Sequence, residues 1–186
     1  MRSTGKLGAV ALLLLVFGAG LACATPPRAS EVLNEARAEA AAQHKNIFFT
    51  FNASWCGPCH RLEMFVNAPQ IAPLLQKYFV FAKLNVAEEH GEHPELENPG
   101  AEKLLVALGG ENTGIPFIFF LDADGNKLAD SNRPVGGKTR FANVGYPDTP
   151  EEIAWFMAML KKGAPGMTDE ERRMVDGKLR LAGRIR

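Results

Sequence analysis

Residues 49–62 of this 186-residue chain, FTFNASWCGPCHRL, decide its fold. An apolar run that favours a β-strand ends in small polar residues at 52–54, and a helix-prone segment starts at Pro58. Cys56 and Cys59 therefore lie at a strand-to-helix turn, with Gly57 and Pro58 between them. The amides and the dipole at a helix N-terminus stabilise an anion, so the pKa of the Cys56 thiol is expected to lie below its free value of about 8.5. The sulfur of Cys59 can reach back within one turn and close a disulfide, so the pair is predicted to be a redox dithiol.

Other uses of the two cysteines stay open. A structural disulfide would close only a two-residue loop, which gains little chain-entropy stabilisation. A zinc site would normally need a second pair of ligands, and the remaining cysteine, Cys23, lies in a segment that is expected to be removed. The run from Cys56 to His60 also fits the C-x-x-C-H pattern of c-type haem attachment, and the two sulfurs could instead carry Cu(I). Visible absorption would reveal haem, and metal analysis of the reduced protein would reveal copper.

Four segments together resemble the thioredoxin superfamily. WCGPC at 55–59 is its active-site motif, FAKLNV at 81–86 is similar to the strand that follows, and GIPF at 114–117 is similar to the segment with its cis-proline. VG at 144–145, before an amphipathic helix, resembles its C-terminal end, while CHRLE and the break at 67–69 resemble a secreted or periplasmic branch. The resemblance covers residues 30–162. It implies an α/β thioredoxin fold, with a central mixed sheet of four or five strands and helices on both faces.

The resemblance also implies thiol–disulfide exchange on protein disulfide or dithiol substrates, with no cofactor and no metal. Cys56, expected to be the more exposed cysteine, attacks a substrate disulfide as a thiolate, and Cys59 resolves the mixed disulfide. Supporting roles fall to Trp55, Gly57 and Pro58 in the turn, to His60 as a nearby positive charge, and to Ile115 and Pro116 as the surface that receives substrate backbone. The Gly-Pro pair resembles reducing members, so a membrane electron donor would have to supply electrons in an oxidising compartment.

One position departs from the superfamily pattern. The buried aspartate that stands five residues before the tryptophan is replaced by Thr50, which cannot titrate near neutrality. The lysine that neighbours this aspartate is matched by Lys83. Glu63 lies four residues after Cys59, about one turn along the same helix face. It could serve as a replacement base with Lys83 as its counter-charge, or it could simply face solvent.

The first 24 residues are typical of a signal peptide. Two basic residues precede an apolar stretch at 10–20 that is too short to span a membrane comfortably, and ACA at 22–24 fits a small-x-small cleavage site. A lipoprotein box with acylation at Cys23 is the alternative, and the chain would contact a membrane only in that case. The sequence therefore predicts a periplasmic or secreted protein, with a lipid anchor at Cys23 as the alternative.

Removal of this leader leaves a single domain with extensions. The leader holds two basic and no acidic residues, which leaves 19 basic against 21 acidic residues and gives no electrostatic reason to expect nucleic acid binding. The expected divisions are a signal peptide at 1–24, a thioredoxin-like domain at 25–162 with an insertion at 87–113, and a C-terminal helical extension at 163–186. His90 and His93 lie in the insertion among glutamates, and a solvated loop is favoured there over a metal site because nothing fixes the geometry.

Several elements follow from local patterns. Helices are expected at about 30–44 with Ser30 as cap, at 101–108, and from Thr149 with a core stripe of Ile153, Phe156, Met157 and Leu160. Thr168 and Glu171 should cap a last helix that runs to about 182. A buried parallel strand is expected at 79–86, further strands at 117–121 and near 127–130, and a polar loop at 132–143.

Overall fold

A computed structural model describes residues 25–136 and 140–183. The expected signal peptide, its cleavage site and Cys23 lie outside the described residues. Within these ranges, no helix is long and apolar enough to cross a membrane.

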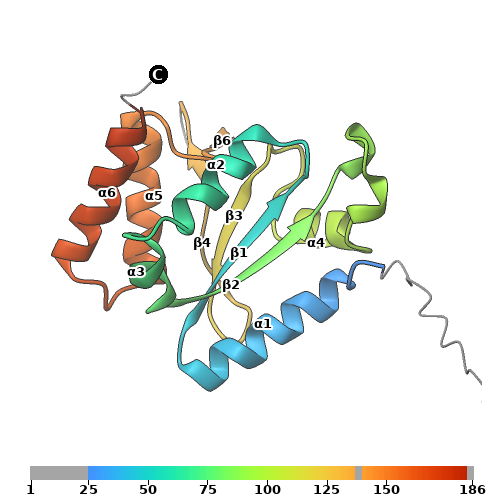
Figure 1. The fold of residues 1–186 in the computed structure, drawn as a ribbon, viewed down its shortest axis with the longest axis horizontal. Helices are drawn as coiled ribbons and strands as arrows, with labels where there is room; N and C mark the ends of the chain where they lie inside the picture. The colour runs from blue at the N-terminus through green and yellow to red at the C-terminus, as the bar shows by residue number, and fades with distance from the viewer. Residues whose placement is uncertain (1–24, 137–139, 184–186) are drawn as a thin grey trace, which may run out of the picture.

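The central sheet has four strands in the order β2-β1-β3-β4 (Figure 1). Strand β1 (Asn46–Asn52) pairs in parallel with β2 (Phe79–Asn85) and antiparallel with β3 (Phe117–Leu121), which pairs antiparallel with β4 (Lys127–Asp130). The sheet is therefore mixed, and the predicted fold class is confirmed. β1 lies in the middle and leads directly into the CGPC turn.

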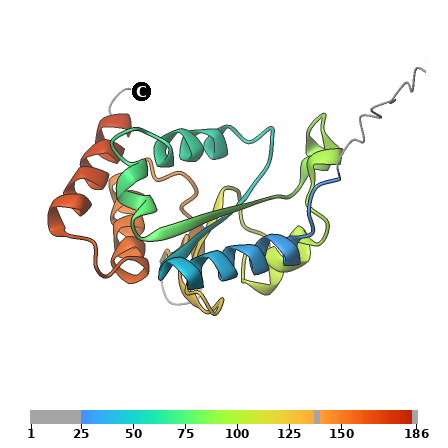
Figure 2. The ribbon, with the colours of Figure 1, turned by 60° about the horizontal axis from the view of Figure 1, so that its bottom comes forward.

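Helices cover both faces of this sheet, as Figure 2 shows. Helices α1 (Ala29–Gln43) and α4 (Ala101–Ala107) pack on one face. Helices α2 (Gly57–Val66), α3 (Ala72–Gln76), α5 (Pro150–Gly163) and α6 (Asp169–Gly183) lie on the other. The short 3-10 helices η1 (Glu88–His90) and η2 (Pro94–Leu96) follow β2, and the hairpin of β5 (Asn132–Pro134) and β6 (Phe141–Asn143) precedes α5.

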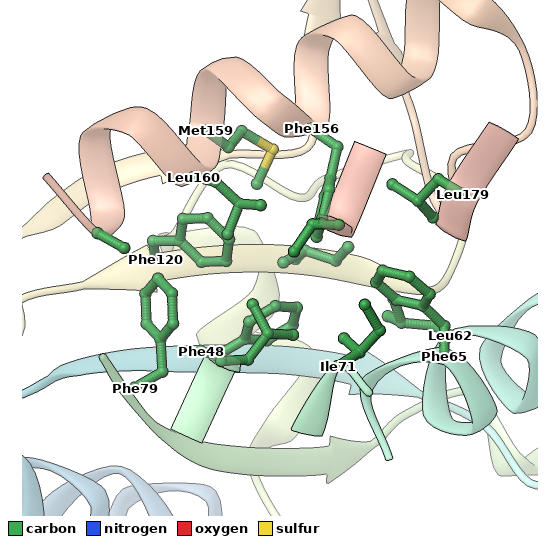
Figure 3. Packing of buried hydrophobic residues seen from close by; sticks show 14 of the residues in the cluster. Phe48, Leu62, Phe65, Ile71, Phe79, Phe120, Phe156, Met159, Leu160 and Leu179 are labelled. Atoms are coloured by element: carbon green, nitrogen blue, oxygen red, sulfur yellow. The ribbon is translucent and has the colours of Figure 1, made fainter. Parts of the chain in front are cut away.

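Alternation along the strands divides the core into two layers. Successive side chains of a strand point to opposite faces, so Phe48 joins the layer under α5 while Phe49 and Phe51 join the layer under α1. In the first layer, the Phe48 ring lies 4.9 Å from Phe120 and 5.8 Å from Phe79, measured between centroids (Figure 3). These aromatic contacts fix β1 between its neighbours and so fix the start of the CGPC turn.

Two expectations about helices need correction. Helix α1 begins at Ala29, with Arg28 rather than Ser30 at the cap, because the Glu31 carboxylate accepts the Arg28 amide and the Pro99 carbonyl accepts the Ala29 amide. In α5 the residue buried beside the stripe is Met159, while the expected Met157 is only half-buried.

Two expectations about the sheet also need correction. Strand β2 is not buried throughout, because it is the edge of the sheet, and Phe81 and Lys83 are exposed on it. Residues 132–143, expected to form a loop, contain the β5–β6 hairpin. The other expected strands and the helix at 101–108 are confirmed.

The C-terminal helix α6 completes the first core layer. The Thr168 hydroxyl accepts the Glu171 amide and the Glu171 carboxylate accepts the Thr168 amide, so the predicted capping box is confirmed. Val175 and Leu179 are fully buried against the same layer as Phe156. Glu171 also accepts a hydrogen bond from the Tyr78 hydroxyl, which ties α6 to the end of α3.

Candidate active site

The two cysteines of the CGPC turn form a disulfide, with an S–S distance of 2.05 Å. Cys56 is the N-cap of α2, and its Sγ accepts the backbone N–H of Cys59 at 3.2 Å. Pro58 occupies the first turn, where its missing N–H leaves no helical hydrogen bond unmade. An amide therefore already points at the sulfur that would carry negative charge after reduction.

The expected difference in exposure between the two cysteines is not present in this disulfide form, because Cys56 and Cys59 are each only 3 % exposed. They differ instead in what they face. Cys56 lines a cleft of about 560 Å³ together with Trp55 and Ile115, whereas Cys59 packs inward against Ala53 and does not line it. A substrate in this cleft would therefore meet Cys56 first.

The Ile115–Pro116 peptide bond is cis, as the resemblance implied. The Ile115 carbonyl oxygen lies 3.6 Å from Cys56 Sγ, and the Ile115 side chain packs against both cysteines. From β6, the Asn143 side-chain amide donates to the carbonyls of Pro116, at 3.0 Å, and Gly114. Sequence analysis missed Asn143, because a lone asparagine in a polar segment gives no sign of what it binds.

Trp55 is held by the segment that follows β2. Its indole N–H donates to the Ala87 carbonyl at 2.8 Å, and the His90 ring approaches its edge with centroids 6.1 Å apart. A Cβ built on Gly91 would lie only 2.6 Å from Cδ1 of the indole, so this position has no room for a side chain. Trp55 nevertheless stays 45 % exposed and forms one wall of the cleft.

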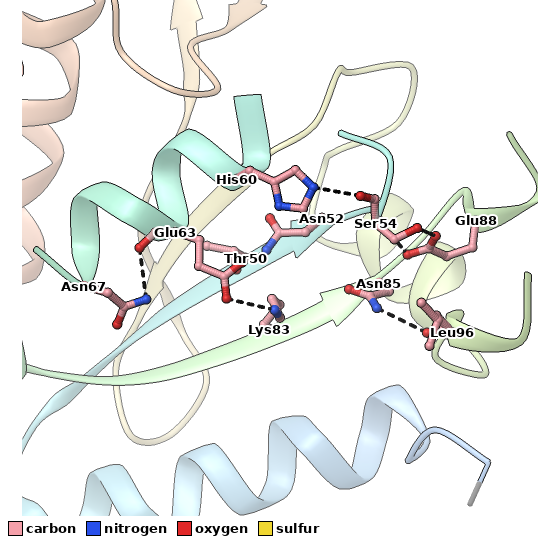
Figure 4. A network of polar contacts seen from close by, with 10 residues as sticks. All are labelled: Thr50, Asn52, Ser54, His60, Glu63, Asn67, Lys83, Asn85, Glu88 and Leu96. Atoms are coloured by element: carbon pink, nitrogen blue, oxygen red, sulfur yellow. Dashed lines mark hydrogen bonds and ion pairs between the residues drawn. The ribbon is translucent and has the colours of Figure 1, made fainter. Parts of the chain in front are cut away.

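Glu88 binds the backbone just before Trp55, as Figure 4 shows. Its two carboxylate oxygens accept the Ser54 amide at 2.8 Å and the Ser54 hydroxyl at 2.6 Å. Glu88 is fully buried. This contact was also missed, since the expected acidic loop suggested only solvated glutamates.

The segment that carries Glu88 is closed at its base by polar contacts. Asn98 accepts the Asn85 amide through its side-chain oxygen at 2.8 Å, and Glu97 accepts the Glu88 amide at 3.2 Å. Burial raises the pKa of the Glu97 carboxyl above its usual value, partly offset by the hydrogen bond from Glu88. Within the described ranges, no group of three or more His, Cys, Asp or Glu residues is placed to hold a metal ion.

Glu63 and Lys83 meet on the side of α2 that faces β2. Lys83 Nζ lies 3.2 Å from Glu63 Oε1, and both side chains are about half exposed. They line a pocket of about 210 Å³ with Thr50 and Asn52, and the buried Oδ1 of Asn52 has no hydrogen-bond partner among the residues that the structure describes (Figure 4). The pairing anticipated from the sequence is present, while Cys59 does not line this pocket.

His60 contacts the backbone of the turn that carries Cys56. Its ring Nε2 lies 2.7 Å from the Ser54 carbonyl oxygen, so this nitrogen carries the hydrogen in that contact (Figure 4). The ring therefore braces the turn from the helix side, opposite the contact that Glu88 makes with Ser54.

Comparisons with known proteins give one family. A family model described as Thioredoxin-like matches residues 28–123, just over half of the chain. The comparison with curated proteins gave no match. Similar solved structures include a disulphide isomerase from Xylella fastidiosa Temecula1, 18% identical with a TM-score of 0.47, covering 81% of this chain and 90% of that one. The oxidised C-terminal domain of Neisseria meningitidis DsbD is 19% identical with a TM-score of 0.40, covering 57% and 84%. A thioredoxin from Thermus thermophilus is 20% identical with a TM-score of 0.44, covering 71% and 87%.

Proposed function

The chain belongs to the thioredoxin-like family, and we propose that it is a thiol–disulfide oxidoreductase that reduces protein disulfides outside the cytoplasm. The observation that carries the proposal is the Cys56–Cys59 disulfide at the N-terminus of α2, opening through Cys56 onto a cleft beside the cis Ile115–Pro116 bond.

The reaction begins from the reduced pair. The Cys56 thiolate, stabilised by the Cys59 amide, attacks one sulfur of a substrate disulfide; a mixed disulfide forms and the other substrate sulfur leaves as a thiolate that takes up a proton. Cys59 then loses its proton and attacks the Cys56 sulfur. The second substrate thiol is released and the Cys56–Cys59 bond forms again, so two electrons have passed from the protein to the substrate.

The cleft walls supply the substrate surface. Ile115 presents its carbonyl next to Cys56, where an extended substrate segment would lie, and Trp55 forms another wall of the cleft. Asn143 holds the Pro116 carbonyl and Glu88 holds the Ser54 turn, so both walls are fixed before substrate arrives. Such preorganisation lowers the entropy cost of binding.

A trapping experiment tests the roles of the two cysteines. Cys59→Ser should accumulate partners in disulfide-linked complexes through Cys56, because the resolving sulfur is gone. Cys56→Ser serves as the matched control and should trap far fewer, since its remaining sulfur lies inward. Equal trapping by the two variants, or none by either, would disprove the assigned roles.

The reducing direction rests on the Gly57–Pro58 pair between the cysteines. We propose that the potential of the couple lies nearer the thioredoxin value of about −270 mV than the strong-oxidant value of about −120 mV, with a membrane protein as electron donor. With dithiothreitol as the source of electrons, the protein should catalyse the reduction of insulin disulfides at a readily measured rate. A potential above roughly −170 mV would reassign the protein to oxidation or isomerisation.

We further propose that Glu63 acts as the base for Cys59, with Lys83 as its counter-charge. Their 3.2 Å contact and the polar pocket they share with Thr50 support this role, because Glu63 follows Cys59 by about one turn of α2 and its half-exposed carboxylate can exchange protons with solvent. Glu63→Gln should slow resolution of the mixed disulfide and change its pH–rate profile, while attack by Cys56 is retained. Stopped-flow resolution rates that superimpose on those of the wild type from about pH 5 to 9 would remove Glu63 from the mechanism.

A further inference from the structure

We propose that Glu88 sets the reducing strength of the disulfide, through a buried negative charge fastened to the backbone of the turn that carries Cys56. Glu88 is a positioning residue, because it touches Ser54 and not the reacting sulfurs. The proposal rests on the proposed function of the same site, and it names Glu88 as the group that favours the reducing direction of thiol–disulfide exchange.

The geometry of the contact fixes the turn. Both carboxylate oxygens are engaged by Ser54, two residues before Cys56, and one of these hydrogen bonds is to the backbone amide. Hydrogen bonds to a charged acceptor are short and roughly twice as strong as neutral ones. On the other side of the turn, His60 contacts the Ser54 carbonyl. Ser54 is therefore held from two elements, and Cys56 follows it with little freedom to move.

The charge of Glu88 is not cancelled nearby. Among the residues that the structure describes, no lysine or arginine forms an ion pair with Glu88, and hydrogen bonds alone satisfy its carboxylate. Because the side chain is fully buried, water and salt screen it far less than they screen an exposed acid. Neighbouring residues Ala87 and His90 line the same cleft as Cys56, and the Glu88 carboxylate contacts Ser54, two residues before that cysteine.

A negative charge here disfavours the thiolate of reduced Cys56. In the balanced reaction, dithiothreitol is oxidised to its cyclic disulfide and the Cys56–Cys59 bond is reduced to two thiols. One of these two thiols is partly ionised. Whatever destabilises this thiolate shifts the equilibrium towards the protein disulfide. Glu88 therefore makes the reduced protein a stronger reductant, in opposition to the Cys59 amide, which stabilises the thiolate.

Glu88→Gln removes the charge of this side chain and nearly preserves its shape. The amide is nearly isosteric, its oxygen can still accept the Ser54 amide, and its NH₂ can donate to the Ser54 hydroxyl, which rotates to accept. We expect the equilibrium constant for reduction by dithiothreitol to increase about tenfold, equivalent to a rise of about 30 mV in potential. The matched control is Glu89→Gln, which removes the same charge from a side chain that is 63% exposed, and its constant should change less than about twofold.

Ser54→Ala provides a second arm that does not depend on the folding of Glu88→Gln. It keeps the buried carboxylate and its bond to the backbone amide, so the constant should stay within about twofold of the wild type. A tenfold change in Ser54→Ala would assign the effect to turn geometry and overturn the proposal. So would an unchanged constant in Glu88→Gln, or equal shifts in Glu88→Gln and Glu89→Gln.

Insulin reduction by the wild type keeps this proposal distinct from the proposed function. If the wild type reduces insulin and Glu88→Gln leaves the equilibrium constant unchanged, only the role of Glu88 fails. If the wild type neither reduces insulin nor traps partners through Cys56, the proposed function fails first.

Discussion

Replacement of Gly91 by alanine should push Trp55 out of its place beside the disulfide. A Cβ at Gly91 would lie 2.6 Å from Trp55 Cδ1 and 3.3 Å from Cγ, whereas carbon atoms in contact normally lie about 3.5–4.0 Å apart. Either the indole or the backbone of η1 must therefore move by about 1 Å. The backbone at Gly91 is extended, with φ −110°, so alanine itself adds no conformational strain.

The smaller cost decides which group moves. If the indole moves, it loses its hydrogen bond to Ala87, about 0.5–1.5 kcal/mol, and part of its edge contact with His90. If η1 moves, the two bonds from Ser54 to the Glu88 carboxylate are strained, and hydrogen bonds to charged groups contribute about 1.5–3 kcal/mol each. The indole is already 45 % exposed, so it should yield. We expect a loss of about 1–2 kcal/mol in the free energy of unfolding, or roughly 2–8 °C in Tm.

Fluorescence can follow the displacement because the chain has only two tryptophans. In a Trp155→Phe background, Gly91→Ala should shift the Trp55 emission to longer wavelength, increase its quenching by acrylamide, and weaken insulin binding as a higher KM. The control in the same background is Gly177→Ala, where a Cβ meets nothing within 4 Å and should stabilise α6 by up to about 1 kcal/mol. Unchanged Trp55 emission together with an unchanged Tm would refute the steric reasoning.

Two further predictions concern the attachment of α6. The hydrogen bond from the Thr168 amide, and after it those from Tyr78 and Lys77, lowers the pKa of Glu171 from 4.5 to about 2. The contribution of the ionised Glu171 to stability is therefore complete above pH 4.5 and is lost as the pH falls towards 2. Glu171→Gln should therefore flatten the dependence of Tm on pH across that window, while Glu170→Gln, a neighbour in the same helix, should leave it intact. Leu179 is fully buried, so Leu179→Ala should lower the free energy of unfolding by about 2–5 kcal/mol in urea titrations. Leu181 is 59% exposed, so Leu181→Ala should change this free energy by less than about 0.5 kcal/mol. Equal losses in the two variants would mean that α6 does not pack as described.

The parts of the fold that follow from local chemistry could be read from the sequence. Strand β3, at residues 117–121, is five apolar residues between a proline and a turn, and the Thr149-Pro-x-Glu box starts α5 where expected. The disulfide at 56–59 can likewise be predicted from local sequence, because a turn followed by the start of a helix brings the two sulfurs together. In each case the deciding contacts lie within a few residues, so the pattern contains them.

Three of the corrections depend on contacts between distant segments. Helix α1 starts early because Pro99 accepts the Ala29 amide, some 70 residues away. Met157 and Met159 flank the α5 stripe on opposite sides, and Met159 is the one covered because the core layer, with β4 beside it, lies on its side of the helix. Phe81 looks like a core residue by composition, yet β2 is the sheet edge, a property of strand order that no local pattern contains.

The side chains missed at the site share one property: each binds backbone of a distant segment. Glu88 binds the turn before Cys56, and Asn143 binds the carbonyls around the cis bond. A polar residue in a polar stretch has no periodicity, so its partner becomes visible only when the sheet brings the segments together. Of the expected supports, the Glu63–Lys83 pair could be anticipated because helix spacing and a strand match placed the two residues on facing elements.

Helix α6, which carries Leu179, and the segment that carries Glu88 lie at opposite ends of the molecule. In both views of the ribbon, α6 is at one end, and the segment after β2 that carries Glu88 is at the other (Figures 1 and 2). Leu179 belongs to the core layer under α5, whereas Glu88 contacts Ser54, which is outside that layer. Mutations at well-separated sites without shared partners add to within about 0.5 kcal/mol. Combining Leu179→Ala with Glu88→Gln should therefore reproduce the stability loss of the first variant and the redox shift of the second. Such a result would mean that the potential of the Cys56–Cys59 couple and the stability of the core can be changed independently.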